Sequence, residues 1–114
     1  MATTRTRPAA EVEPLLDAGL DAPAIARLTG RSTRTAERWV SGATAPRGEG
    51  RERLLAVEAV LESLAAALPG ADAASWLQRP NAELDFESPA ELIERGEGRR
   101  VLGMLTAIGE GAFL

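Results

Sequence analysis

One stripe of apolar residues constrains the fold of this chain more than any other feature. From residue 54 onward, apolar side chains recur at intervals of three and four residues: Leu54, Val57, Leu61, Leu64 and Leu68. This spacing places them on one face of an α-helix, so it predicts a long helix from about Glu49 to Leu68. The stripe could be the core that joins two halves of the chain or the interface of a homodimer, and periodicity alone allows both.

The rest of the chain is also predicted to be helical. No useful stretch alternates with period two, Ala and Leu are abundant, and β-branched and aromatic residues are few. Start and stop residues such as Asp21, Ser32, Ser88 and Gly30 delimit further helices. We expect them over residues 9–18, 22–29, 33–41, 73–78, 89–95 and 97–110. The predicted fold class is all-α, a small helical bundle.

Composition excludes several kinds of chemistry. The 114 residues include no Cys and no His, so zinc ribbons, disulfides, thiolate nucleophiles and imidazole bases are ruled out. Catalysis would have to use carboxylates, hydroxyls or arginines. We therefore expect no catalytic residues, no metal site, no cofactor and no enzymatic activity, with scattered carboxylates as the weak alternative.

The charge divides along the chain. Residues 1–53 carry nine Arg against seven acidic residues, and residues 54–114 carry four Arg against ten, which gives +2 and −6 within a total of −4. Such asymmetry predicts a different partner for each half. Met1 to Pro8 is polar and the longest apolar run, Leu64 to Pro69, is far too short to span a membrane. A cytoplasmic protein is expected.

A first motif lies in the basic part, residues 25–42. Ala26 permits close helix packing, Gly30 suits a tight turn, and Trp39 would fill the space between helices. With Arg38-Trp39, Gly42 and the later Pro46, the segment resembles the helix-turn-helix of the Xre/Cro type over about residues 10–50.

That resemblance implies a DNA-contacting face on the second helix of the motif. Thr33, Arg34, Glu37 and Arg38 would face the major groove, where the arginines could read guanine or hold phosphate. An ordinary solvated helix face is the alternative. Arg31 stands where such motifs often carry an aliphatic residue, and Glu37 brings a negative charge toward phosphates.

A second motif covers about residues 70–114. Its ordered signature reads Trp76-Leu77, Pro80-Asn81, Leu84, Ser88-Pro89, Leu92-Ile93, Gly96-Glu97, Val101, Leu105, Ile108 and Gly111. Each piece of this signature can also be explained by local structure, such as a capping box formed by Ser88 and Glu91. The alternative interpretation of the segment is therefore a plain helical hairpin with no binding role. Taken together, the string resembles the toxin-binding domain of Xre/MbcA/ParS antitoxins. The match to MbcA-like antitoxins extends over nearly the whole chain.

The resemblance implies a partner and a mechanism. Antitoxins of this family bind RES-domain toxins that destroy NAD⁺, and their C-terminal segment blocks the active site. In this chain the toxin-binding segment would be Gly109, Glu110, Gly111, Ala112, Phe113 and Leu114. Alternatively, Phe113 folds back onto the last helix. Acidic residues such as Glu91, Glu94 and Glu97 could steer the encounter or simply be solvated.

The resulting hypothesis is an antitoxin in three parts. Residues 1–50 would form the helix-turn-helix domain, residues 51–68 a connecting helix, and residues 69–114 the toxin-binding domain. The expected partners are a cognate RES-domain toxin and, through the N-terminal half, operator DNA, in a homodimer or a higher hetero-oligomer with toxin. The alternative is a stand-alone helix-turn-helix transcriptional regulator with a C-terminal dimerisation module.

Overall fold

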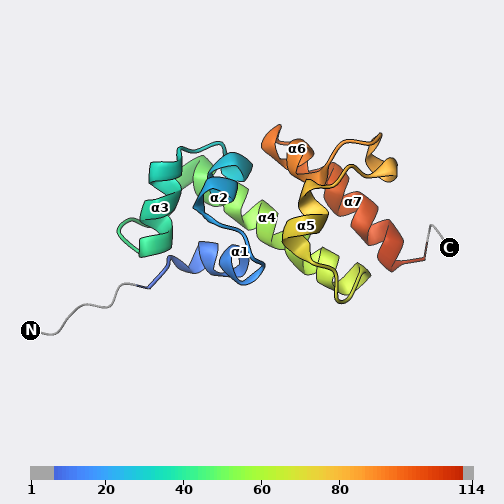
Figure 1. Ribbon diagram of the computed structural model, residues 1–114, viewed down its shortest axis with the longest axis horizontal. Helices are drawn as coiled ribbons and strands as arrows, with labels where there is room; N and C mark the ends of the chain where they lie inside the picture. Colours follow the sequence, from blue (N-terminus) through green and yellow to red (C-terminus); the bar gives the residue numbers. More distant parts are fainter. Residues whose placement is uncertain (1–6, 112–114) are drawn as a thin grey trace, which may run out of the picture.

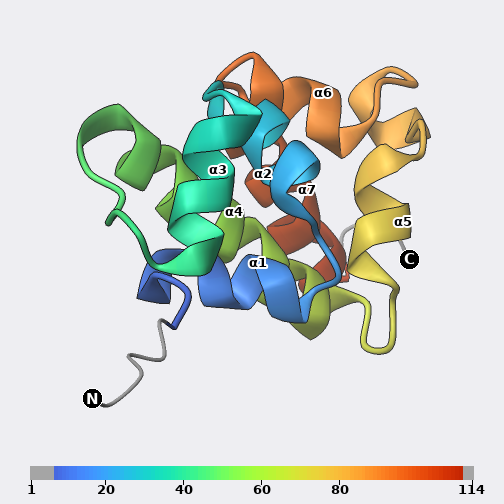
Figure 2. The same ribbon diagram turned by 60° about the vertical axis from the view of Figure 1, so that its left-hand side comes forward.

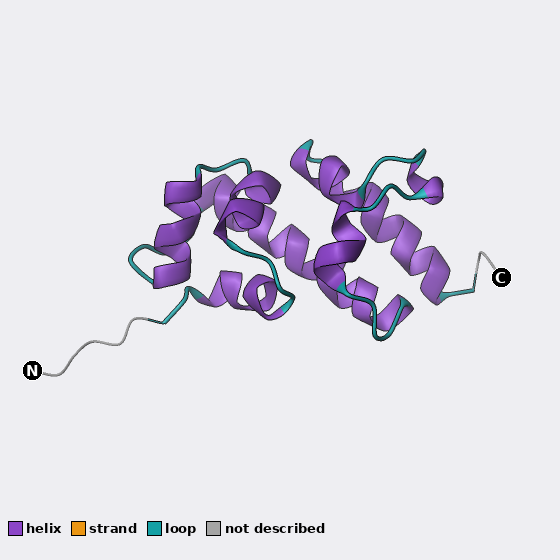
Figure 3. Ribbon diagram, in the orientation of Figure 1, coloured by secondary structure: helices purple, strands orange, loops and turns teal. Residues whose placement is uncertain are grey.

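All regular secondary structure in the computed structural model, which describes residues 7–111, is helical (Figure 3). This confirms the all-α prediction. The elements are η1 (Ala10–Val12), α1 (Glu13–Asp17), α2 (Ala22–Thr29), α3 (Thr33–Ser41), α4 (Gly48–Ala67), α5 (Ala73–Gln78), η2 (Ala82–Leu84), α6 (Pro89–Glu94) and α7 (Gly98–Gly109). No helix within residues 7–111 is long and apolar enough to cross a membrane.

Helix α4 is the long helix against which both halves of the molecule pack. Helices α1 to α3 lie along its first part and α5 to α7 along its second part (Figures 1 and 2). It packs against α7, α2 and α1, and α2 also touches α6 directly. The two halves therefore share one continuous core.

The apolar stripe of α4 belongs to this core. Leu54 and Val57 are fully buried and Leu64 is 2% exposed within the single chain. Burying each such side chain contributes roughly 1.5–3 kcal/mol relative to leaving it in water. Periodicity alone allowed this stripe to be either the core or a homodimer interface, and the structure favours the core. The face is already covered within the single chain, so a homodimer could use it only if the covering helices moved away.

The predicted helix boundaries around the first motif are confirmed. Asp21 caps α2, where its Oδ1 accepts a hydrogen bond from the Ala24 N–H at 3.0 Å. Ser32 caps α3 by accepting from the Thr35 N–H at 3.1 Å. Gly30 ends α2 with φ +72°, a left-handed conformation that glycine adopts without steric strain.

Helix α5 has the expected bounds, and the ends of the other helical segments differ from the expected ones by at most one residue, when η1 and α1 are counted together. The first helix begins with a 3₁₀ turn, η1, α4 ends at Ala67 instead of Leu68, and α7 spans Gly98–Gly109 instead of 97–110. The short helix η2 and the tight turn after it were not predicted. A lone antiparallel bridge between Asn81 and Glu87 closes that turn.

Trp39 is buried, and its ring packs against the start of α4, whereas the sequence motif predicted it between the two helices of the helix-turn-helix. It is 4% exposed, and its backbone carbonyl accepts a hydrogen bond from the Ala9 N–H at 3.0 Å. Its ring lies so close to Gly50 that a Cβ there would sit 3.1 Å from the Cζ2 and Cη2 atoms. A side chain at position 50 would therefore compete with Trp39 for the same volume.

Arg53 joins the two halves through their backbones. Its guanidinium donates to the carbonyl of Leu28, at the end of α2, and to the carbonyl of Ile93, in α6, at 3.4 Å each. The last carbonyls of a helix have no intrahelical hydrogen-bond donor. One arginine side chain therefore supplies donors to a carbonyl near the end of a helix in each half of the molecule. These hydrogen bonds help to fix how the helix-turn-helix lies against the C-terminal helices.

Candidate functional site

The exposed face of α3 carries the residues predicted to meet DNA. Thr33, Arg34 and Arg38 are all exposed, while Ala36 and Trp39 on the opposite face are buried. The helix thus turns a polar, mainly basic face outward and an apolar face inward. The geometry is compatible with the predicted groove contact.

A cleft of about 700 Å³ opens beside this face, at the start of α4. Three arginines line it: Arg31, Arg38 and Arg47. Glu49 also lines the cleft and pairs with Arg31 at 3.1 Å. The cleft keeps a net excess of positive charge, and arginine side chains suit planar binding of phosphate oxygens.

Only one of the three cleft arginines is a site residue predicted from the sequence. That residue is Arg38, whereas Arg47 stands in the connector and Arg31 is a departure from the motif. Thr33 and Arg34 lie on the same helix but do not line the cleft. The available signal was the excess of arginine between residues 27 and 53. Which of these arginines meet depends on how α4 packs against Trp39.

The second candidate surface is formed by α5, η2, α6 and α7. Trp76 is partly buried and packs against the core, while its neighbour Leu77 is fully buried, in agreement with a structural role. The predicted capping box is present: Ser88 Oγ accepts from the Glu91 N–H at 3.1 Å, and Glu91 Oε1 accepts from the Ser88 N–H at 2.9 Å. Glu91 therefore stabilises the start of α6.

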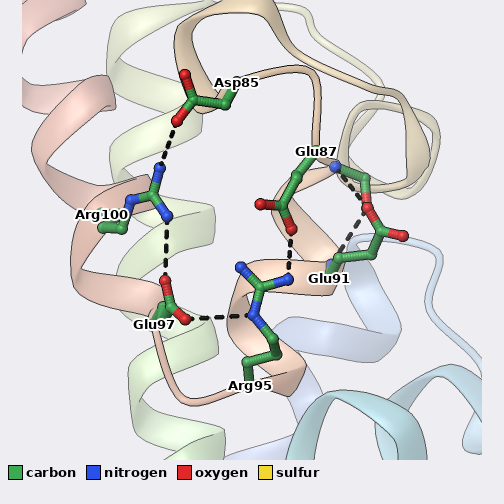
Figure 4. A network of polar contacts seen from close by, with 7 residues as sticks. Asp85, Glu87, Glu91, Arg95, Glu97 and Arg100 are labelled. Carbon is green, nitrogen blue, oxygen red and sulfur yellow. Dashed lines mark hydrogen bonds and ion pairs between the residues drawn. The ribbon is translucent and has the colours of Figure 1, made fainter.

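A chain of ion pairs joins the turn after η2 to α6 and α7 (Figure 4). Arg95 donates to Glu87 and, at 3.2 Å, to Glu97. Arg100 donates to Glu97 at 3.1 Å and to Asp85 at 3.4 Å. The network ties three separate stretches of chain into one surface.

These contacts change the ionisation of the carboxylates. Hydrogen bonding from Arg95 lowers the pKa of Glu87 below its ordinary value. Hydrogen bonds from Arg95 and then Arg100 lower the pKa of Glu97 in the same way. Glu97 is therefore already paired within the chain, whereas Glu94, also predicted to steer a partner, is exposed.

The turn between η2 and α6 holds a residue that the sequence motifs do not single out. Phe86 is 74% exposed and has φ +67°, directly after Asp85 with φ +57°. Left-handed backbone is uncommon for residues other than glycine. The available signal was an aromatic residue placed between two acidic ones in a polar stretch.

The predicted toxin-binding segment is described in part. Helix α7 ends at Gly109, and the Glu110 N–H donates to the Thr106 carbonyl at 3.0 Å. At Gly111 the backbone enters the left-handed region, with φ +81°, so the chain leaves the helix axis there. The remaining predicted residues, Ala112, Phe113 and Leu114, lie outside the described residues.

Comparisons with known proteins give a consistent result. Residues 56–111 match the family model described as the antitoxin Xre/MbcA/ParS C-terminal toxin-binding domain. The chain is 33% identical over 96 residues to the mycobacterial cidal antitoxin MbcA of Mycobacterium bovis and of Mycobacterium tuberculosis, covering 84% of this chain and 85% of each relative. It also resembles a chain in the crystal structure of the M. tuberculosis MbcT–MbcA toxin–antitoxin complex, with a TM-score of 0.77, 31% identity and coverage of 91% of this chain and 94% of that one.

Proposed function

The chain belongs to the Xre/MbcA/ParS antitoxin family, and we propose that it binds and neutralises a cognate toxin. The observation that carries this proposal is the extent of the match. Identity of 31% and a TM-score of 0.77 extend over 91% of the chain, so both halves of the fold are shared with a chain of a toxin–antitoxin complex. In this proposal the chain itself is not an enzyme, and the chemistry belongs to the partner.

The proposed toxin is of the RES type, which degrades NAD⁺, and the proposed inhibitory segment is Gly109 to Leu114. The end of α7 supports this assignment. The helix stops at Gly109, and the left-handed Gly111 directs the chain away from its axis.

Deleting Gly111 to Leu114 tests the inhibitory segment. The truncated chain keeps α7 and the core, so we expect unchanged far-UV circular dichroism and loss of inhibition of the proposed cognate toxin. A matched chain lacking residues 2–6 controls for shortening at a terminus. Full inhibition by the C-terminally truncated chain would exclude the segment as the inhibitor.

A second proposed activity is DNA binding through α3, by which the antitoxin would regulate its own operon. The exposed Thr33, Arg34 and Arg38, together with the arginine-lined cleft beside them, favour this activity. Replacing Arg34 and Arg38 by Ala should weaken operator binding and reduce the salt-dependence slope by about 0.9 for each phosphate that the variant no longer neutralises. Arg99→Ala, on α7, is the control.

The alternative of a stand-alone transcriptional regulator differs from the antitoxin proposal in what it predicts for toxin binding. It requires operator binding by the wild-type chain and no binding to the toxin. Absence of DNA binding at low salt would remove the regulatory role and leave the antitoxin proposal intact. The two activities can therefore be tested separately with the same purified chain.

A further inference from the structure

Phe86 is the large apolar side chain with the greatest exposure in the described part of the protein. Its exposed fraction is 74%, against 39% for Leu55, the other exposed large apolar residue there. Exposure of one aromatic side chain is common by itself. What distinguishes Phe86 is its backbone, since both it and Asp85 have positive φ. Strained conformations persist where the surrounding structure enforces them, often at binding sites.

The surroundings of Phe86 hold it in place on both sides. Its N–H donates to the Asn81 carbonyl at 2.9 Å, and the Asn81 N–H donates to the Glu87 carbonyl at 3.1 Å. The preceding Asp85 pairs with Arg100 on α7, and the following Glu87 pairs with Arg95 at the end of α6 (Figure 4). The flanking residues are thus fixed to two helices while the ring itself stays in solvent.

We propose that Phe86 is a preorganised anchor that inserts into an apolar pocket of the partner toxin. The proposal rests on the proposed function, and Phe86 lies inside the 56–111 segment that matches a toxin-binding domain. Because the backbone that carries the ring is already ordered, binding need not order it, and aromatic side chains are common among the residues that dominate binding energy.

The charges around Phe86 predict which charges border that pocket on the partner. The Asp85 side chain is 88% exposed despite its contact with Arg100, and Glu83 is exposed on η2 nearby. An apolar pocket bordered by basic side chains complements this arrangement. This contact is separate from the C-terminal segment, so the toxin would be held at two places.

Phe86→Gly in the full-length chain separates binding from folding. Glycine adopts the left-handed conformation readily, so the unfolding midpoint should equal or exceed that of the wild type. Affinity for the purified cognate toxin, measured by calorimetry, should fall about 30-fold or more. Phe86→Leu keeps an apolar side chain and should weaken binding less. Leu55→Ala is the matched control and should bind like the wild type.

Each outcome decides one point. If the wild type does not bind the toxin, the proposed function fails and this inference fails with it. If the wild type binds and Phe86→Gly binds equally well, only the inference is overturned. The inference would also be overturned if Leu55→Ala reduced the affinity for toxin as much as Phe86→Gly does. It would be overturned as well if Phe86→Gly dissociated a wild-type dimer but left the toxin affinity unchanged, because Phe86 would then contact a second copy of this chain.

Discussion

Gly50→Ala tests whether the start of α4 is as closely packed as the geometry indicates. Gly50 is buried in the first turn of α4, and a Cβ there would lie 3.1 Å from two carbons of the Trp39 ring. Ordinary carbon–carbon contacts are about 3.5–4.0 Å, so the ring or the helix would have to move by roughly half an ångström. Trp39 is 4% exposed, so a shift of its ring would also have to displace the neighbours that cover it.

Two effects of known size oppose each other in this variant. Alanine is favoured over glycine inside a helix by about 1 kcal/mol, and less in the first turn. Inserting a methyl group into a filled core destabilises by about 1–3 kcal/mol. The packing effect should dominate, and we expect Gly50→Ala to lower the free energy of unfolding by about 1 kcal/mol, or the melting temperature by about 4 °C.

Gly103→Ala is the matched control. Gly103 is in the middle of α7, and no atom of the described residues 7–111 outside its own stretch of helix lies within 4 Å of the position its Cβ would take. Helix propensity then acts alone and should raise the stability by about 1 kcal/mol. Urea unfolding followed by circular dichroism measures both variants. If Gly50→Ala were stabilised as much as Gly103→Ala, the packing of Trp39 against Gly50 would not be tight and the reasoning would be refuted.

The remaining predictions concern contacts that join the elements. Arg53→Met keeps the aliphatic stem but removes the hydrogen bonds to two backbone carbonyls, and should lower the free energy of unfolding by about 1–2 kcal/mol in urea; no change would mean that these 3.4 Å hydrogen bonds contribute nothing. Ser88→Ala removes the N-cap of α6 and should lower the free energy of unfolding by about 1 kcal/mol, measured in the same way. Because Glu87 and Glu97 have lowered pKa values in the folded chain, their stabilising effect is present above the ordinary carboxyl pKa and disappears as the pH falls through the lowered values. Thermal unfolding of the wild type and of Arg95→Met should therefore converge in acid, and an equal difference at neutral and acid pH would contradict this.

Local signals predicted the parts of the fold that depend on neighbours in sequence. Asp21, Ser32 and Ser88 are N-caps because their side-chain oxygens reach N–H groups three residues on, and this contact needs no tertiary structure. Gly30 marks the end of α2 for another local reason, because glycine adopts the left-handed conformation that ends a helix. These elements could be predicted with nearly correct boundaries.

Features that depend on contacts between distant residues could not be predicted in the same way. The period of the apolar stripe on α4 shows that one face is covered, but not whether α7 or a second chain covers it. The left-handed turn at Asp85 and Phe86 is held by Arg100 and Arg95, which follow later in the sequence. The convergence of Arg31 with Arg47 likewise depends on the packing of α4 beneath Trp39.

Inhibition of the toxin is the most direct test of the central claim. The proposed cognate toxin would be purified, and its consumption of NAD⁺ measured with increasing amounts of the full-length chain. We expect the rate to fall in proportion to the added chain and to vanish once the toxin is saturated. An unchanged rate at a large molar excess of the folded chain would contradict the proposal that this protein neutralises a RES-type toxin.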